Sequence, residues 1–290
     1  MKKITILSGK GGVGKSSIIA SLAVVLSANM KIIAADCDVD ASNLALVLGV
    51  RKHDEWKSLS TNLKARIDYS KCTNCKRCFQ SCYFHAIDWE TKPTILAERC
   101  EGCGVCVLAC PEHAIMLEKA ENAKIGYADT KYGFKVVSAQ LNIGESGSGK
   151  VVSEVRRLAE IKGEDSDIML IDAAAGIGCP VIASVTGVNH VVAVTEPTPS
   201  GMSDLKRALQ LVEHFNIPCS IIINKFDINP VMAANIEGFA RAKHIDIIGK
   251  IPYDKQFVDA LVKLTPIVDY NQKYLNMFNM IAEKIIKKIQ

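Results

Sequence analysis

A glycine-rich segment near the N-terminus constrains the fold of this chain more than any other feature. It runs from Gly9 to Ser16, reads G-K-G-G-V-G-K-S and follows the apolar run 4–7. A strand, a glycine loop and a helix in this order let backbone N–H groups converge on phosphate oxygens at the helix N-terminus. The segment therefore predicts a phosphate-binding loop that follows a strand of an α/β sheet.

The rest of the chain alternates short apolar runs with helical patterns, except in a middle region. This alternation predicts a doubly wound, mostly parallel α/β sheet. In the middle region, residues 52–66 are polar and predict a connection, and residues 124–129 with 134–141 predict a hairpin. The strands we expect are 4–7, 31–36, 168–172, 191–195, 219–224 and 245–248, with helices at 15–28, 151–161, 202–215 and 230–243 and two more at the C-terminus.

Eight of the eleven cysteines lie in two runs of identical spacing, C-x2-C-x2-C-x3-C. The runs are 28 residues apart, and each is followed by His-Ala-Ile. Cysteines in a reducing compartment more often bind metal than form disulfides, so these thiols are candidate metal ligands. Pro111 follows the second run, whereas Tyr83 stands at the matching place after the first.

Charge and hydropathy argue against several classes of partner. The net charge of +4 is too small to indicate nucleic acid. No apolar run approaches the ~20 residues of a membrane span, and the N-terminal apolar run is too short for a signal peptide. We therefore expect a cytoplasmic protein without a nucleic-acid or membrane partner. The basic, amphipathic segment 277–289 is expected to pack on the sheet, although a membrane anchor is the alternative.

Lys10 gives the phosphate loop the form K-G-G-V-G-K-S, which resembles the deviant Walker A motif of the MinD/ParA/Mrp/nitrogenase-iron-protein superfamily. Two further segments fit this resemblance: D-C-D-V-D at 36–40 and the apolar run 168–172 that ends in Asp172. The resemblance covers residues 1–50 and 145–290. It implies a P-loop NTPase fold, magnesium-dependent ATP hydrolysis and an ATP-dependent homodimer in which Lys10 reaches the phosphates of the partner.

The same resemblance implies roles for individual residues. Lys10, Lys15 and Asp38 would be catalytic, and Ser16, Asp38 and Asp172 would hold Mg²⁺. The segment N-K-F-D at 224–227 would place Asn224 at adenine, although this motif also suits guanine, so GTP is an alternative substrate. The nucleotide would contact Gly9, Lys10, Gly11, Gly12, Val13, Gly14, Lys15, Ser16, Ser17, Asn224 and Pro252.

The cysteine runs resemble those of bacterial two-cluster ferredoxins, in which the fourth cysteine of each run ligates the other cluster. This resemblance implies a small α+β ferredoxin-like insertion with two [4Fe-4S] clusters, although zinc is an alternative metal. The predicted domains are 1–62 and 120–290 for the ATPase and 63–119 for the insertion. The implied ligand sets are Cys72, Cys75, Cys78 and Cys110 for one cluster, and Cys82, Cys100, Cys103 and Cys106 for the other.

The remaining cysteines and a second glycine-rich segment carry weaker predictions. Cys179 lies seven residues after Asp172, where the nitrogenase iron protein has a cluster ligand, so it is either an interface thiol or a ligand of a bridging cluster. A second such ligand has no clear match, because Ser146 and Ser148 occupy that region. The segment 144–150 reads G-x4-G-K but lacks the following Ser or Thr, which favours an interface loop over a second nucleotide site. Cys37 and Cys219 are expected in the core.

Three outputs fit a nucleotide switch joined to iron–sulfur clusters. The first is ATP-gated electron transfer to an unknown redox partner. The second is an iron–sulfur or metallocofactor assembly ATPase of the Mrp/Nbp35 kind, which delivers a cluster to an apo-metalloprotein. The third is a spatial positioning switch of the MinD/ParA kind with structural clusters. The sequence favours them in this order.

Overall fold

The structure is a computed structural model that describes residues 1–145 and 148–290. These residues form two compact units. The sheet unit comprises 1–56, 125–140 and the described residues from 148 to 290, and the cysteine unit comprises 57–124 and 141–145. The insertion predicted at 63–119 lies within the cysteine unit, which begins earlier and ends later in the chain.

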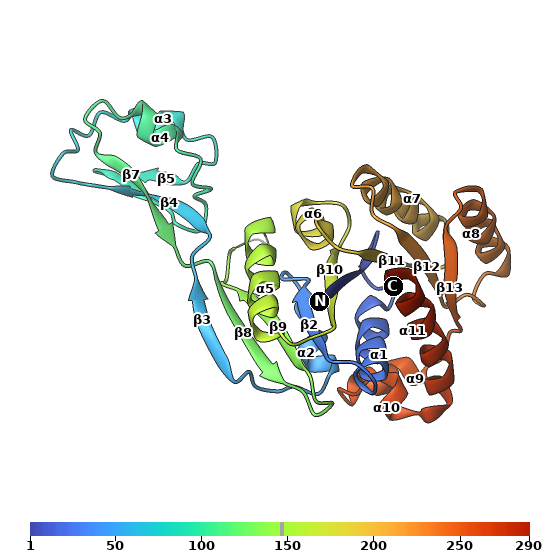
Figure 1. Ribbon diagram of the computed structural model, residues 1–290. Helices are drawn as coiled ribbons and strands as arrows, with labels where there is room; N and C mark the ends of the chain where they lie inside the picture. Colours follow the sequence, from blue (N-terminus) through green and yellow to red (C-terminus); the bar gives the residue numbers. More distant parts are fainter. Residues whose placement is uncertain (146–147) are drawn as a thin grey trace. The chain divides into compact units, whose positions relative to one another are not determined.

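The sheet unit is built on one nine-stranded sheet of order β13-β12-β11-β1-β10-β2-β9-β8-β3 (Figure 1). Neighbouring strands from β13 to β9 pair in parallel, which confirms the predicted, mostly parallel α/β sheet. The strands are β1 (Lys2–Ser8), β2 (Ile32–Cys37), β3 (Glu55–Leu59), β8 (Ala123–Asp129), β9 (Lys135–Leu141), β10 (Ile168–Ala175), β11 (His190–Thr195), β12 (Cys219–Asn224) and β13 (Asp246–Ile251).

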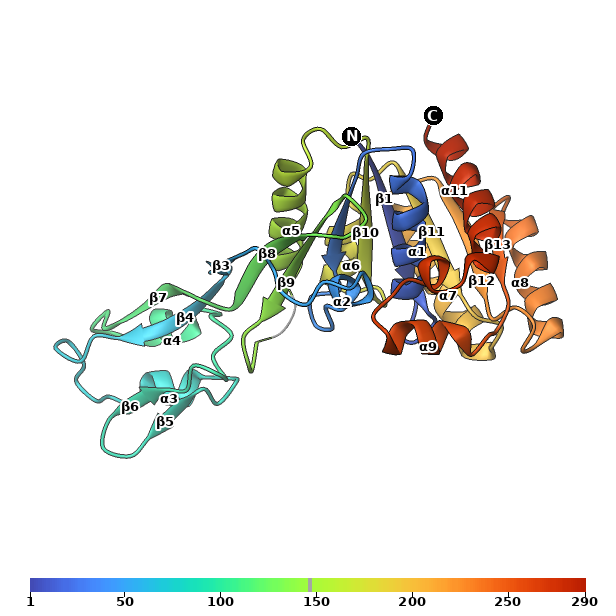
Figure 2. The ribbon, with the colours of Figure 1, turned by 90° about the horizontal axis from the view of Figure 1, so that it is seen from below.

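Helices cover both faces of this sheet (Figures 1 and 2). On one face α1 packs against α11, whose buried stripe includes Phe278, Ile281 and Ile285. The last helix thus contributes its apolar side to the core. Helices α5 to α8 lie on the other face. The bounds are α1 (Lys15–Ser27), α2 (Leu44–Val47), α5 (Gly149–Lys162), α6 (Cys179–Val185), α7 (Pro199–His214), α8 (Pro230–Ala242), α9 (Gln256–Val262), α10 (Ile267–Tyr270), the 3₁₀ turn η1 (Gln272–Tyr274) and α11 (Leu275–Ile289).

Two sequence predictions of secondary structure were wrong. Residues 52–66 were expected to be a connection, but they contain β3 and most of β4 (Asn62–Ile67). Their polar composition reflects an edge position, because β3 ends the sheet and its middle residues are exposed. The C-terminal region also holds α9, α10, η1 and α11 in place of two helices.

The cysteine unit contains the same local structure twice. Helix α3 (Arg77–Ser81) follows a left-handed residue, Lys76, and α4 (Val105–Ala109) follows a left-handed Gly104 at the matching place in the repeat. Strand β4 pairs antiparallel with β7 (Ile115–Ala120), and β5 (Ile87–Trp89) pairs antiparallel with β6 (Pro93–Ile95). The 28-residue sequence repeat is therefore also a structural repeat.

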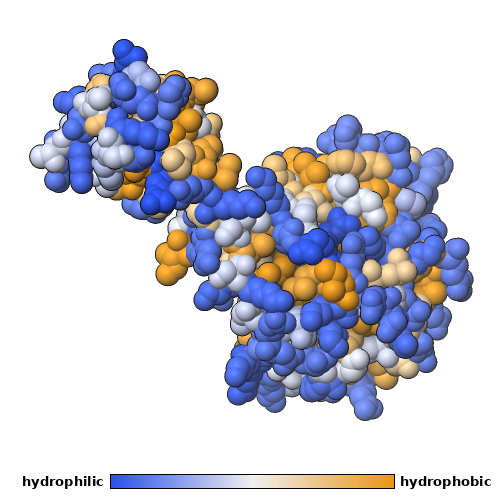
Figure 3. Space-filling model, turned by 60° about the vertical axis from the view of Figure 1, so that its left-hand side comes forward, coloured by the Kyte–Doolittle hydropathy of each residue, from blue (hydrophilic) through white to orange (hydrophobic). Residues whose placement is uncertain are grey.

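The surface is hydrophilic over most of the face that Figure 3 shows, with smaller hydrophobic patches between. Within residues 1–145 and 148–290, helices of the length and hydropathy needed to span a bilayer are absent.

Candidate functional site

The glycine-rich loop connects β1 to α1. Gly12 and Gly14 adopt φ angles of 81° and 88°, a left-handed conformation that favours glycine. A Cβ atom on Gly14 would also lie 2.4 Å from the side-chain amide of Asn224. That amide donates to the carbonyl of Val13 at 2.7 Å and so ties the loop to the end of β12. The sequence and packing together hold the loop with the N-terminus of α1 behind it, as an anion site requires.

Lys15 and Ser16 meet Asp172 at the start of α1. The Lys15 ammonium donates to one carboxylate oxygen of Asp172, and the Ser16 hydroxyl donates to the other at 3.0 Å. Asp172 is fully buried and Lys15 nearly so. Burial alone would lower the pKa of Lys15, but the neighbouring carboxylates, Asp172 foremost, outweigh it and raise the pKa. Lys15 therefore stays charged inside the protein.

Two more carboxylates come from the end of β2. Asp36 is fully buried and is the register partner of Asp172 on the neighbouring strand. Burial and the Asp172 charge raise the pKa of Asp36 to about 7, against hydrogen bonds from Ser42 and the N–H of Leu44 that lower it. Asp38 lies 3.8 Å from the Lys15 ammonium, and burial raises its pKa as well. Lys15 is thus the cation of a three-carboxylate cluster.

Lys10 points to the other side of the loop, towards β11 and α7. Its ammonium forms an ion pair with Glu196 at 2.8 Å and donates to the Ser200 hydroxyl at 3.1 Å. The second oxygen of Glu196 binds the ammonium of Lys225 at 3.0 Å. We did not single out Glu196 from the sequence. Its position directly after an apolar strand could have indicated a site residue, because ligand sites in parallel sheets lie at the carboxyl ends of strands.

The segments predicted to lie beside the base are neighbours. Phe226 donates its N–H to the carbonyl of Ile251 at 3.1 Å, and Tyr253 donates its N–H to Asp227 at 2.7 Å. Pro252 lies between these two bonds and next to the strand end that carries Asn224. Both polar atoms of the Asn224 side chain bind protein groups: the nitrogen donates to the carbonyl of Val13, and the oxygen accepts from the N–H of Lys225.

The region after β10 brings Gly176 and Cys179 close to the loop and to α5. Gly176 has a φ of 100° and donates its N–H to the carbonyl of Ser8, the last residue of β1. Cys179 begins α6 and is exposed. Its carbonyl oxygen would lie 3.2 Å from a Cβ atom added to Gly149, so α5 and α6 approach each other closely at this glycine. Ser148 caps α5 by accepting from the N–H of Val151. Ser146 lies outside the described residues, so the predicted loop 144–150 is described only in part.

The cysteines outside the two runs differ from one another. Cys37 is fully buried in β2, as predicted. The prediction for Cys219 was wrong, because it is only half-buried. It opens β12 at the rim of the sheet, where strand residues have fewer neighbours than those in the middle.

The eight cysteines of the runs surround two separate cavities in the cysteine unit. Each cavity takes three cysteines from one run and the fourth from the other. The first also contacts Ile67, Trp89 and Ile115, and the second contacts Ala65, Phe84 and Leu117. The four thiols are Cys72, Cys75, Cys78 and Cys110 in the first cavity, and Cys82, Cys100, Cys103 and Cys106 in the second.

Backbone N–H groups point at three of these sulfur atoms. Ala86 and Ala114 donate to Cys82 and Cys110 at 3.3 Å, and Ala65 donates to Cys100 at 3.4 Å. Such bonds stabilise a thiolate ligand. Among residues 1–145 and 148–290, three or more His, Cys, Asp or Glu side chains do not converge on one position for a single metal ion. Each group of four thiols surrounds a cavity instead.

His85 and His113 occupy matching positions after the runs. Each has a φ of 48° and donates its N–H to the carbonyl of the fourth cysteine of its run at 3.2 Å. Both shape the turn after a short helix.

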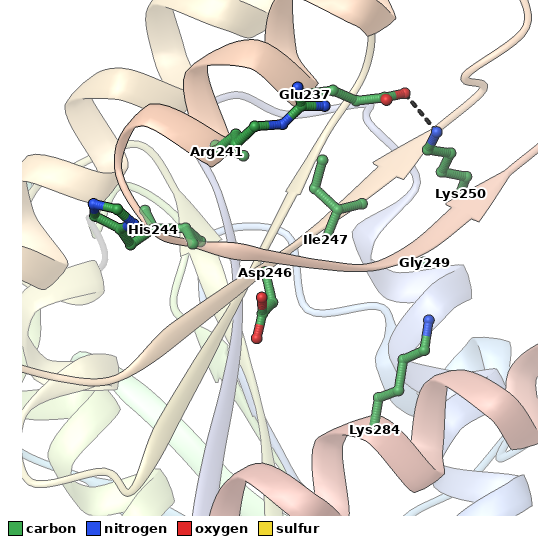
Figure 4. A pocket seen from close by; sticks show the side chains of 10 residues that line it. Glu237, Arg241, His244, Asp246, Ile247, Gly249, Lys250 and Lys284 are labelled. Atoms are coloured by element: carbon green, nitrogen blue, oxygen red, sulfur yellow. Dashed lines mark ion pairs between the residues drawn. The ribbon is translucent and has the colours of Figure 1, made fainter.

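A separate hollow of about 600 Å³ lies at the outer edge of β13, between α8 and α11 (Figure 4). Lys250 and Glu237 form an ion pair at its rim, and Lys284 donates to the carbonyl of Ile248 on the edge strand. None of the residues singled out from the sequence lines this hollow.

Comparisons with known proteins agree with this geometry. The family model for the CobQ/CobB/MinD/ParA nucleotide binding domain matches residues 4–267. An uncharacterized protein of Methanocaldococcus jannaschii, MJ0578, is 35% identical over 285 residues, which cover 98% of this chain and 96% of that protein. An iron-sulfur cluster carrier protein of the same organism is 23% identical over 309 residues, with 99% and 85% of the two chains covered.

The chain is also similar to solved structures. One is the septum site-determining protein MinD of Pyrococcus horikoshii in complex with Mg-ADP. The TM-score is 0.61 at 19% identity, and the match covers 99% of this chain and 96% of that one. At this identity the match shows a common fold.

Proposed function

Because the chain belongs to the CobQ/CobB/MinD/ParA nucleotide-binding family, we propose that it is a magnesium-dependent ATPase that works as a homodimer and gates electron transfer by two [4Fe-4S] clusters. The observation that carries the proposal is the presence of two cavities, each lined by four thiols, in a chain that also has a complete phosphate loop. The predicted domains, 1–62 with 120–290 and 63–119, are the ATPase and cluster-binding parts in this proposal.

The residues around the phosphate loop fit magnesium and ATP. Lys15 is bound to Asp172 in this structure. When ATP binds, the Lys15 ammonium would move to contact the β and γ phosphates. Ser16 and Asp172 then offer a hydroxyl and carboxylate oxygens, the hard ligands that Mg²⁺ prefers. The raised pKa of Asp38 suits a group that orients the attacking water and accepts its proton. Asn224 and Pro252 would lie beside adenine.

Lys10 would act in the partner subunit. In the single chain its ammonium binds Glu196, which follows β11, and Ser200 on α7. In a closed pair it would add positive charge to the phosphates of the partner, as an arginine finger does. Hydrolysis would then depend on pairing, and ATP would control whether the pair is open or closed.

The residues of the cysteine unit fit two cubane clusters. All eight ligands are thiols, the donors that iron–sulfur clusters use, and the fourth thiol of each cavity comes from the other run. When bound, each cluster would accept and release one electron. The protein would hold the thiolates, donate N–H groups to three of them and limit water with Ile67 and Leu117. The chain passes between the two units within β3 and β8, which offers a covalent route for coupling.

Metal analysis of anaerobically purified protein tests the cluster part. We expect about eight iron and eight sulfide per chain. A Cys106→Ser variant should lose about half of both, whereas Cys219→Ser, which changes a half-buried thiol outside the runs, should keep them. Zinc in place of iron would refute the proposal.

Two further measurements test the nucleotide part. Lys10→Ala should reduce ATP hydrolysis by about 10³-fold, the lower range for a charge supplied in trans. Reduced protein should show an EPR spectrum or an electron-transfer rate that changes when MgATP is added. If the spectrum, the reduction potential and the rate are all unaffected by MgATP, electron transfer is not gated.

A second candidate function, delivery of an iron–sulfur cluster, is favoured by the exposed Cys179 at the start of α6 and by similarity to the carrier protein. In this case Cys179→Ser should fail to transfer a cluster to an apo-ferredoxin, while Cys219→Ser transfers it normally. Equal transfer by both variants would exclude a role for Cys179.

A further inference from the structure

The Lys10 ammonium is held by its own chain through two contacts. It lies 2.8 Å from Oε1 of Glu196 and donates to Oγ of Ser200 at 3.1 Å. Lys10 follows β1, Glu196 follows β11 and Ser200 is the second residue of α7. Because β1 and β11 are adjacent strands, these contacts are built into the carboxyl edge of the sheet.

Glu196 has more than one cationic neighbour. Its Oε2 atom binds the ammonium of Lys225 at 3.0 Å, and Lys225 follows β12, the next strand along the sheet. The Glu196 side chain is only 12% exposed. Burial alone would raise its pKa, but hydrogen bonds from Lys10 and Lys225 outweigh burial and lower the pKa below its usual range. Glu196 is therefore a charged carboxylate shared by two lysines.

We propose that Glu196 is a positioning residue that holds Lys10 within its own subunit and thereby opposes the nucleotide-dependent pairing of two chains. This inference rests on the proposed function, in which Lys10 crosses to the phosphates of the partner.

The Lys10 ammonium cannot bind Glu196 and the phosphates of a partner at once. When Lys10 leaves, Glu196 keeps its bond to Lys225 and is not left as an isolated buried charge, which would be costly. The exchange is therefore feasible in both directions. Pairing then requires the partner's nucleotide to attract Lys10 more strongly than Glu196 and Ser200 do.

A Glu196→Gln variant removes the negative charge and keeps an oxygen that accepts a hydrogen bond. Dimerisation of the purified full chain with Mg·AMPPNP, measured by sedimentation velocity, is the test. We expect the dimer dissociation constant to fall by about fivefold, the factor that a partly exposed ion pair is worth. The matched control is Glu213→Gln. Glu213 lies on α7, the same helix as Ser200, and forms an exposed ion pair with Lys243, so its loss should leave dimerisation unchanged.

A second pair of variants shows whether the effect passes through Lys10. In a Lys10→Met background, Glu196→Gln should no longer change the dissociation constant, because the two residues form one coupled pair. Ser200→Ala should tighten the dimer by less than Glu196→Gln, since it removes a neutral acceptor. The inference is overturned if Glu196→Gln leaves wild-type affinity unchanged or weakens it, or if it tightens the dimer equally without Lys10. Absence of a nucleotide-dependent dimer in every variant would overturn the proposed function itself.

Discussion

The two units of this chain are stabilised in different ways. The sheet unit has an extended apolar core in which most residues of strands β1, β10 and β11 are buried, and its phosphate loop follows one of these strands. The cysteine unit has a small core of eight buried residues in its described part, and three of these are cysteines. In the sheet unit, an apolar core positions the phosphate loop. In the cysteine unit, the candidate metal ligands themselves make up part of the core.

This difference affects what each unit needs in order to fold. Burial of apolar surface stabilises the sheet unit without any ligand. A unit of about 70 residues rarely gains enough from its core alone, and bound metal commonly supplies the remainder. We therefore expect changes at the phosphate loop to act on a folded unit, and loss of the clusters to unfold the cysteine unit.

The largest expected effect is from loss of the proposed clusters. Stripping the metal with a chelator under denaturant-free conditions should leave the sheet unit resistant to trypsin and unfold the backbone around Lys76 and Arg77, whose side chains are exposed already in the folded unit. We expect cleavage there to accelerate by about 100-fold, because binding worth ~2.7 kcal/mol already changes the unfolded fraction by that factor. Equal protection of the stripped and native proteins would show that the cysteine unit has a sufficient core of its own.

Within the sheet unit, the largest effect is expected at its buried charges. Lys15→Met removes the cation from a cluster of carboxylates and leaves Asp172 fully buried without it. We expect the free energy of unfolding, measured by urea titration without nucleotide, to fall by about 3–5 kcal/mol. Lys10→Met, which affects a partly exposed pair, should cost less than about 1 kcal/mol. Similar losses in the two variants would contradict this account.

A smaller effect should appear as a pH dependence of the sheet unit. Burial and Asp172 raise the pKa of Asp36 from 3.8 to about 7, so between these values folded Asp36 keeps a proton that the unfolded chain has lost. Stability should then fall as pH rises from about 4 to about 7, by at most about 1.4 kcal/mol per pH unit. Thermal unfolding of Asp36→Asn should lack this decrease. A variant with the same pH profile as the wild-type chain would assign the decrease to other groups.

The smallest effect is expected on the surface of the cysteine unit. Arg66 and Glu118 form a 2.9 Å ion pair across β4 and β7, but their side chains are 71% and 44% exposed. Arg66→Ala should lower the stability of the metal-loaded unit by less than about 1 kcal/mol. Replacing the buried neighbour Ile67 by Ala should cost about 2–5 kcal/mol in the same assay. If the Arg66 variant costs as much as the Ile67 variant, the surface pair contributes more than such pairs normally do.

Much of the sheet unit was predictable from local patterns. The loop at Gly9–Ser16, the strand that carries Asp172 and the final amphipathic helix each follow from residues close together in the sequence. The strands at 52–66 were not predictable from hydropathy, because an edge strand needs few apolar residues. The role of Glu196 was missed for a different reason: its partner Lys10 is 186 residues away, and adjacent strand ends bring the two together.

The sequence by itself determined the phosphate loop and the two matching cysteine runs, because glycine conformations and cysteine spacings are local properties of the chain. The grouping of the eight thiols into two sets of four was already implied by the resemblance to two-cluster ferredoxins, whereas only the tertiary structure decided that Asp36 and Asp172 lie opposite each other in the sheet. The tertiary structure also decided that Lys10 is bound to Glu196 rather than to solvent. These contacts depend on strand order, which brings distant residues together and cannot be deduced from spacing along the chain.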